Sequence, residues 1–198
     1  VSPGATFKLY PCGRPPLFAV DCALAIQDRH HVQPKDIKKI RCDVSFLFPR
    51  TLIHTHPTNG LQAKASLQYC IATCLLDGRP NLNSFSDAMV NRPEITQIID
   101  LIEVNVPPHL SEDIPEVRKA PFAQPVTLVV ETHNGQIFTE TVPIHKGSPK
   151  NPASEADLKQ KFLDCAGLHM PKERAQETLA YMQDGKNSIR KLMQLITV

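Results

Sequence analysis

The chain has 198 residues, of which 41% are hydrophobic and 21% charged, and a formal net charge of +2, values that describe a globular chain of one domain, or of one domain and part of another. The small net charge and the lack of a long Lys/Arg run argue against a nucleic-acid partner. No apolar run reaches the roughly 20 residues that cross a bilayer and no signal-peptide pattern occurs, so we expect a cytoplasmic protein without membrane contact.

The first three quarters of the chain alternate between strand and helix patterns. The expected elements are a strand over 7–10, a helix over 17–28, a strand over 37–48, a helix over 61–77, two short helices within 84–101 and a strand over 103–106. Five prolines between 107 and 125 predict a long loop. Two β-rich runs within 126–142 then flank Asn134-Gly135, a pair typical of a type I′ hairpin turn.

The sequence changes character after Lys146-Gly147. Three expected helices and no strand follow: one opened by a Ser154–Asp157 capping box and running through Cys165, one from Pro171 to a stop at Gly185, and one over 189–196. We therefore predict an α+β fold for residues 1–146, followed by a purely helical segment over 149–198.

Three short helices cannot readily bury their apolar sides against one another alone, so we expect them to pack against another part of the protein. They would pack either on residues 1–146 or on a helical domain outside this chain, and the change in composition favours the second. The chain also begins with Val1 rather than Met and leads almost directly into an apolar segment. We therefore expect a piece of a longer protein.

The six cysteines contain no Cys-x-x-Cys pair. Cys70 and Cys74 lie four residues apart on one helical face, but no histidine or third cysteine accompanies them as a metal site would require. Most of the cysteines have apolar neighbours. We therefore expect reduced thiols that pack as small core residues, and no metal.

Tyr69 stands out in the expected helix 61–77. At 100° per residue it falls nearly opposite the main apolar stripe, beside the small residues Ala65 and Ala72. A helix with apolar residues on two sides is sandwiched between neighbours, and the small residues would leave a gap at the tyrosine hydroxyl, as in a cleft wall. The alternative is a structural tyrosine whose hydroxyl forms a hydrogen bond at a domain contact.

Lys8 raises a similar question. In the expected strand it points to the face opposite Phe7 and Leu9. Taken from the residues alone, it is either a solvated surface lysine or a positive charge at a site.

Arginines and histidines in the expected loops give weaker signals. Arg14 and Arg50 can each hold a carboxylate through two hydrogen bonds, although a lone arginine usually forms a surface ion pair. His54 and His56 form a His-x-His pair with no carboxylate nearby in the sequence, which favours a loop pair without a metal. No phosphate-binding glycine loop, nucleophile elbow or paired catalytic carboxylates occur.

Several motifs together resemble one known family. KLYPC at 8–12 and AVDCA at 19–23 are similar to the K-x-Y-P-C…A-x-D-A-A pattern of the MmgE/PrpD family, and PTNGLQAKASLQYC…LLDG at 57–78 resembles its most recognisable helix. Further similarities follow in family order across nearly the whole chain: Phe85, Asp87, Val90, Arg92, Pro93, the hairpin, GSPKNP at 147–152, Leu158, Lys161 and Phe162.

The resemblance implies a domain arrangement. Members of the family have an all-helical domain, made from the N-terminal half and the last helices, and an α+β lid inserted between. Residues 1–146 would be the lid, and 149–198 the helices that return to the helical domain, which this chain otherwise lacks. Members commonly dimerise, so a homodimer is expected, and the active site lies between the two domains.

The resemblance also implies site residues. Lys8 and Tyr69 match an active-site lysine and tyrosine, and Lys64 matches a lysine common in one branch. We add Arg14 and His56 as candidates that bind substrate. Family members often have histidine, arginine and phenylalanine where this chain has Leu17, His56 and Ala65, so the substrate is left open.

The implied function is that of a lyase or isomerase for a small di- or tricarboxylate, which needs no metal or organic cofactor. The family includes 2-methylcitrate dehydratase, cis-aconitate decarboxylase and iminodisuccinate epimerase. The chemistry would be proton abstraction next to a carboxylate, followed by dehydration, decarboxylation or epimerisation. The alternative is a non-catalytic fragment or binding module that keeps the fold, and the chain alone is expected to be nearly inactive.

Overall fold

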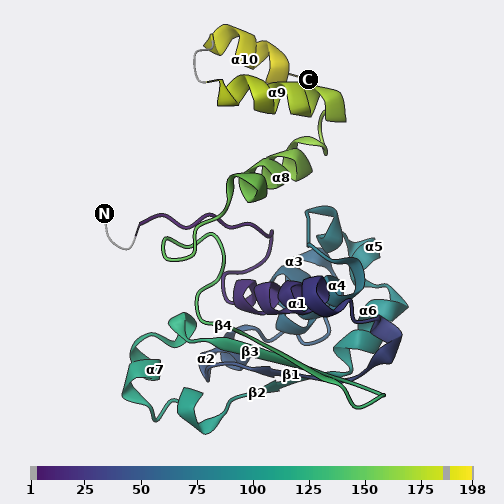
Figure 1. Ribbon diagram of the computed structural model, residues 1–198, viewed down its shortest axis with the longest axis vertical. Helices are drawn as coiled ribbons and strands as arrows, with labels where there is room; N and C mark the ends of the chain where they lie inside the picture. The colour runs from purple at the N-terminus through teal and green to yellow at the C-terminus, as the bar shows by residue number, and fades with distance from the viewer. Residues whose placement is uncertain (1–3, 185–187, 198) are drawn as a thin grey trace. The chain divides into compact units, whose positions relative to one another are not determined.

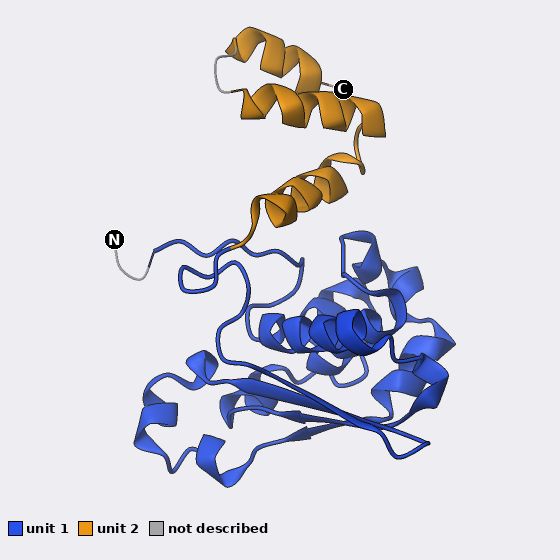
Figure 2. Cartoon of the chain, viewed as in Figure 1, with its two compact units in different colours: residues 1–152 blue, residues 153–198 orange. Residues whose placement is uncertain are grey.

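The computed structural model describes residues 4–184 and 188–197, and it divides into two compact units (Figures 1 and 2). The first unit covers residues 1–152 and the second 153–198. The division falls after the GSPKNP segment, in which Gly147 N–H donates to the Asn151 carbonyl over 2.8 Å.

The first unit is built on a mixed sheet of four strands in the order β2-β1-β3-β4. The strands are β1 (Ile37–Asp43), β2 (Ile102–Asn105), β3 (Val126–Thr132) and β4 (Ile137–Val142). β1 pairs in parallel with β2, with Ile40 opposite Ile102, and antiparallel with β3, with Ile40 opposite Val130. The predicted α+β class is confirmed.

Helices pack on one face of this sheet (Figure 1). The helices of the first unit are α1 (Pro16–His30), α2 (Leu47–Thr51), α3 (Gly60–Lys64), α4 (Leu67–Asp77), α5 (Asp87–Val90), α6 (Pro93–Ile99) and α7 (Pro115–Lys119), with short 3-10 turns η1 (Pro34–Asp36), η2 (Asn83–Phe85), η3 (Pro108–Leu110) and η4 (Pro121–Ala123). α1 contacts β3 and β4, and α4 lies against α1 and α6.

Burial follows the sequence pattern. Alternate residues of β3 are buried (Val126, Leu128, Val130 and Thr132), as in an antiparallel strand with one face on the core. α4 is buried on all sides from Leu67 to Leu75, which confirms that this helix is sandwiched.

The predicted helix over 61–77 is wrong as a single element. It breaks at Ala65 into α3 and α4, because Ser66 acts as an N-cap whose hydroxyl accepts a hydrogen bond from Tyr69 N–H over 3.1 Å. The break changes the phase of the helix. Angular positions calculated across residues 61–77 therefore do not apply to Tyr69.

Other predicted bounds also need correction. Residues 7–10 are not a strand, since among the described residues their one backbone bond to another segment joins Phe7 to Gly147. The strand predicted over 37–48 ends at Asp43, where α2 soon follows, and the long loop 107–125 contains α7 and two 3-10 turns.

The β3–β4 hairpin is confirmed, but its turn is not type I′. Gly135 alone in the turn has positive φ (+83°), and its N–H donates to the Thr132 carbonyl over 3.0 Å. This is the three-residue loop in which a type I turn is followed by a left-handed glycine.

The second unit contains α8 (Glu155–Ala166), α9 (Lys172–Gln183) and α10 (Ile189–Ile196). The predicted capping box of α8 is confirmed: Ser154 accepts from Asp157 N–H, and Asp157 accepts from Ser154 N–H. The expected stop at Gly185 lies outside the described residues. Within the described ranges, no helix is long and apolar enough to span a bilayer.

Candidate functional site

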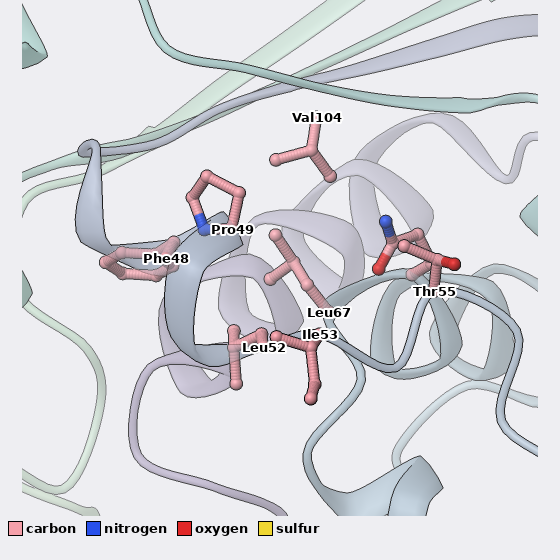
Figure 3. A pocket seen from close by; sticks show the side chains of 8 residues that line it. Phe48, Pro49, Leu52, Ile53, Thr55, Leu67 and Val104 are labelled. Atoms are coloured by element: carbon pink, nitrogen blue, oxygen red, sulfur yellow. The ribbon is translucent and has the colours of Figure 1, made fainter.

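An uncharged cavity lies beside the start of α4 (Figure 3). Its volume is about 470 Å³, and its lining residues are Phe48, Pro49, Leu52, Ile53, Thr55, Leu67, Gln68 and Val104. Gln68 is buried, and its Oε1 has no hydrogen-bond partner in the described part of the chain. Transfer of two or three carboxylates into such a cavity would be costly without opposite charges, and none of the five predicted site residues lines it.

The segment that carries Lys8 is fixed by a close backbone contact. Phe7 N–H donates to the Gly147 carbonyl over 2.8 Å, and a Cβ on Gly147 would come within 2.1 Å of the Phe7 carbonyl oxygen. Gly147 has φ +88°, a conformation that glycine adopts without strain. The GSPKNP segment therefore supports the KLYPC segment, although the two lie far apart in the sequence.

Asp21 of α1 makes the second attachment. Its Oδ1 accepts a hydrogen bond from the Tyr10 hydroxyl over 3.1 Å, and its Oδ2 accepts from Lys146 N–H over 2.6 Å. Burial raises the pKa of Asp21, and the hydrogen bonds from Lys146 and Tyr10 oppose that rise. Burial and the neighbouring Asp21 charge likewise raise the pKa of Tyr10.

Lys8 lies between these attachments and is exposed. It makes no hydrogen bond or ion pair with any residue that the structure describes. Phe7 is 56% exposed while Leu9 is buried, so the predicted alternation of the two faces is wrong. An uncommitted ammonium group on a fixed backbone is available to an anionic ligand.

The structure brings the segments of Arg14 and Lys64 together. Gly13 N–H donates to the Lys64 carbonyl over 2.7 Å, so the residue before Arg14 adjoins the end of α3. Arg14 is exposed and Lys64 half-buried. Two cations from different segments therefore have neighbouring backbones, although no contact joins their side chains within the described residues.

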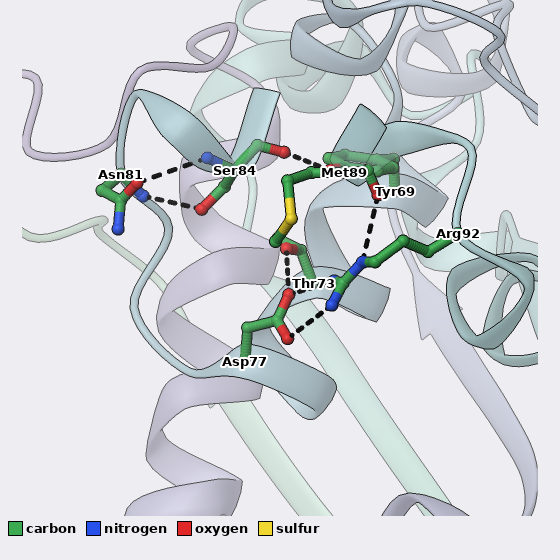
Figure 4. Close-up of polar contacts among 7 residues, drawn as sticks. All are labelled: Tyr69, Thr73, Asp77, Asn81, Ser84, Met89 and Arg92. Atoms are coloured by element: carbon green, nitrogen blue, oxygen red, sulfur yellow. Dashed lines mark hydrogen bonds and ion pairs between the residues drawn. The ribbon is translucent and has the colours of Figure 1, made fainter. Parts of the chain in front are cut away.

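Tyr69 is fully buried, and the expected gap at its hydroxyl is absent (Figure 4). The hydroxyl donates a hydrogen bond to the Ser84 carbonyl, and its ring lies 5.6 Å from that of Phe85. Burial raises the pKa of Tyr69 to about 12, opposed by Thr73 and Arg92. The hydroxyl is therefore protonated at neutral pH and acts as a donor.

An ion pair between Arg92 and Asp77 lies near Tyr69. Arg92 contacts the Asp77 carboxylate through both terminal nitrogens, with Nη1 to Oδ1 at 3.2 Å, and its Nε donates to the Met89 carbonyl over 3.3 Å (Figure 4). Both side chains are partly exposed. The pair links the end of α4 to the start of α6.

His56 is exposed, and its Nε2 lies 2.8 Å from Asp100 Oδ1. No carboxylate lies near this histidine in the sequence, but the fold brings Asp100 to it from the end of α6. No group of three His, Cys, Asp or Glu side chains suited to a metal ion occurs in residues 4–184 and 188–197.

Sequence reasoning missed the importance of Asp21, although this residue stands inside the AVDCA motif. Its partner Lys146 is 125 residues away, and no local pattern announces that contact. A second pair of motifs meets in the same way: Gly60 N–H donates to Asp87 Oδ1 over 2.8 Å, and a Cβ on Gly60 would collide with the Phe85 carbonyl. These contacts bring together in the fold short motifs that are separate in the sequence.

Fold and motifs thus define a protein whose α+β unit, with its fixed lysine-bearing segment, is followed by a separate helical unit. The family model described as the MmgE/PrpD C-terminal domain matches residues 10–184. The chain belongs to the MmgE/PrpD family, as the motifs predicted.

Two mammalian relatives are similar to parts of the chain. Human cis-aconitate decarboxylase is 29% identical over 106 residues, covering 54% of this chain and 21% of the relative. Mouse cis-aconitate decarboxylase is 25% identical over 163 residues, covering 79% of this chain and 31% of the relative. The matched regions thus span less than a third of either relative.

Proposed function

We propose that this chain is the C-terminal part of a lyase or isomerase that acts on a small di- or tricarboxylate without a cofactor. The observation that carries the proposal is Lys8: an exposed ammonium group without a protein partner in the described residues, on a segment fixed on both sides, in a chain of the MmgE/PrpD family. Similarity to two cis-aconitate decarboxylases supports the lyase class.

In this proposal Lys8 supplies positive charge where negative charge develops. Removal of a proton next to a carboxylate gives an enolate-like species, and a fixed ammonium group stabilises it more than water does. Because the backbone around Lys8 is already held, little reorganisation is needed during the reaction. Expulsion of a β-hydroxide as water would then complete a dehydration, and return of the proton to the other face would complete an epimerisation. A decarboxylation also requires a proton donated to the substrate, because the carbon that loses carbon dioxide keeps the electron pair of the broken bond.

Tyr69 is proposed as the proton donor of the site. Its pKa near 12 suits a donor rather than a base at neutral pH. In the structure its hydroxyl is bound to the Ser84 carbonyl, so the proposal requires this hydrogen bond to exchange for one to substrate. Arg14, His56 and Lys64 are proposed to bind the carboxylates.

The other wall of the site is proposed to come from an N-terminal helical domain of the same protein, against which residues 149–198 would pack. The apolar side chains that α10 exposes support this arrangement: Ile189 is 77% exposed and Met193 52% exposed. We propose further that the whole protein is a cytoplasmic homodimer.

A second candidate is a binding module or fragment without catalysis. One observation favours it: the Tyr69 hydroxyl is already bound inside the first unit and is not exposed. Such a chain would keep the fold of the family without its chemistry.

The test is turnover by the whole protein, prepared with its N-terminal domain. Substrates are 2-methylcitrate, cis-aconitate and iminodisuccinate, and proton NMR in D₂O identifies the products and deuterium next to a carboxylate. The proposal predicts turnover of at least one substrate that persists in the presence of a chelator. Binding of these acids without any turnover or deuterium exchange would support the binding module instead.

A further inference from the structure

We propose that Asp21 is a positioning residue for Lys8: by holding the two segments that flank and support Lys8, its carboxylate fixes where the ammonium group stands. The inference rests on the proposed function for its catalytic consequence. The tether itself is independent of that function.

Asp21 contacts both the segment that contains Lys8 and the segment that supports it. One carboxylate oxygen accepts from the Tyr10 hydroxyl, two residues after Lys8, and the other accepts from Lys146 N–H, next to Gly147. Gly147 in turn accepts from Phe7 N–H, the residue before Lys8. Tyr10, Asp21, Lys146, Gly147 and Phe7 thus form a closed loop of contacts around Lys8.

A carboxylate suits this role better than an amide. It accepts two hydrogen bonds with two equivalent oxygens, and charge-assisted bonds are the stronger kind. An asparagine would keep the shape but accept through one oxygen only, so one of the two segments would lose its acceptor.

Asp21 is half-buried, and packed side chains surround its contacts. His145, only 2% exposed, faces Asp21 closely enough to favour its charged form, and the Phe18 ring lies edge-on against His145 with centroids 4.9 Å apart. The Arg79 guanidinium lies over the Tyr10 ring, 5.3 Å from its centroid. The buried Tyr10 ring is therefore held by packing, and its hydroxyl is kept beside Asp21.

The first experiment measures the tether by amide hydrogen exchange in the 198-residue chain. In Asp21→Asn we expect the Phe7 and Lys146 amides to exchange at least about tenfold faster, because their local opening becomes easier. Ile40 and Val44, whose amides donate to the Leu101 and Asn105 carbonyls in the sheet, should keep their rates. Unchanged exchange at Phe7, or an equal increase at all four amides, would overturn the proposal.

Two further variants distinguish loss of the Asp21 hydrogen bonds from a general loss of stability. Tyr10→Phe removes one of the two hydrogen bonds to Asp21. It should increase the exchange rate of the Phe7 amide more than that of the Lys146 amide. Asp28→Asn makes the same chemical change on an exposed position of α1 and should leave both amides as they are. Faster exchange at Phe7 in the Asp28 variant would contradict a specific role for Asp21.

The second experiment is a double-mutant cycle on turnover by the whole protein. Asp21→Asn alone should lower kcat/KM about 10- to 100-fold with little change in KM, as expected for a misplaced catalytic group. Added to Lys8→Ala, it should cause less than about a twofold further loss, because the group that it positions is gone. Multiplicative losses would overturn the positioning role.

The two experiments distinguish a failure of the proposed function from a failure of the role proposed for Asp21. A whole protein without turnover, or a Lys8→Ala variant with wild-type turnover, would overturn the proposed function. Amide exchange would still decide whether Asp21 holds the Lys8 segment.

Discussion

At the scale of single residues, burial decides what Asp21 and Tyr69 can do. Both lie inside motifs that the sequence made visible, but their partners, Lys146 and the Ser84 carbonyl, come from other segments. Residue type and spacing therefore singled out Tyr69 but not Asp21. They did not predict burial, because that depends on contacts far apart in the sequence.

The raised pKa of Asp21 makes a pH prediction. Its ordinary value is 3.8, so between 3.8 and the raised folded value the folded state holds more protons than the unfolded state. Stability from this group is then fully present below 3.8 and is lost as pH rises through the folded pKa.

The measurement is urea unfolding of wild type and Asp21→Asn between pH 3 and 7. The wild-type free energy of unfolding, relative to the variant, should fall as pH rises. A relative stability that increases with pH would show that the folded pKa is lowered instead.

Tyr69 makes a stability prediction that is separate from catalysis. Tyr69→Phe keeps the ring against Phe85 but leaves the buried Ser84 carbonyl without this donor. We expect a loss of about 1–3 kcal/mol in the free energy of unfolding, measured by urea denaturation. Tyr181 is the matched control, because its hydroxyl donates to the Ser188 carbonyl at an exposed position. Tyr181→Phe should lower the free energy of unfolding by less than about 0.5 kcal/mol. Equal costs would contradict the buried role of Tyr69.

At the scale of elements, the features that depend on neighbouring residues were predicted correctly. The capping box of α8, the Pro-initiated α1 and the β3–β4 hairpin were expected from residue patterns, because caps, prolines and β-rich runs act through neighbouring residues. The break between α3 and α4 was missed. Its N-cap, Ser66, stands among good helix formers, so the apolar periodicity seemed to run through it.

Gly147 tests the contact between segments. Gly147→Ala combines a left-handed backbone with a Cβ that would lie 2.1 Å from the Phe7 carbonyl oxygen. Gly135→Ala is the matched control, since it has φ +83° but nothing within 4 Å of its Cβ. The control should cost about 1–2 kcal/mol from backbone strain, and Gly147→Ala should cost at least about 1 kcal/mol more, measured by urea unfolding. Similar costs would mean that the contact at Phe7 relaxes freely.

At the scale of the whole molecule, the two units differ in how much they bury. The first has a sheet with helices on it, whereas α10 exposes Ile189 and Met193, and within the described residues of the second unit the buried side chains are those of Asp157, Ala175 and Thr178. The change of composition after Gly147 predicted this contrast. It could not give the position of the second unit in the whole protein.

The contrast predicts stepwise unfolding of the 198-residue chain. Amides of α8 and α9 should lose protection at lower urea than the β1 and β3 amides, because a small unit with little buried apolar surface is less stable. NMR peak intensities across a urea series measure both. One cooperative transition shared by both units would contradict the prediction, and with it the need for a helical partner domain.

The role of Lys8 in catalysis is tested by kcat/KM of the whole protein, measured for wild type and Lys8→Ala on the carboxylate substrate that the wild type turns over. Removal of a fixed charge from the reacting centre should lower kcat/KM by at least about 100-fold, whereas Lys35→Ala, at an exposed lysine of η1, should leave it unchanged. A Lys8→Ala variant with the kcat/KM of wild type would show that Lys8 takes no part in catalysis.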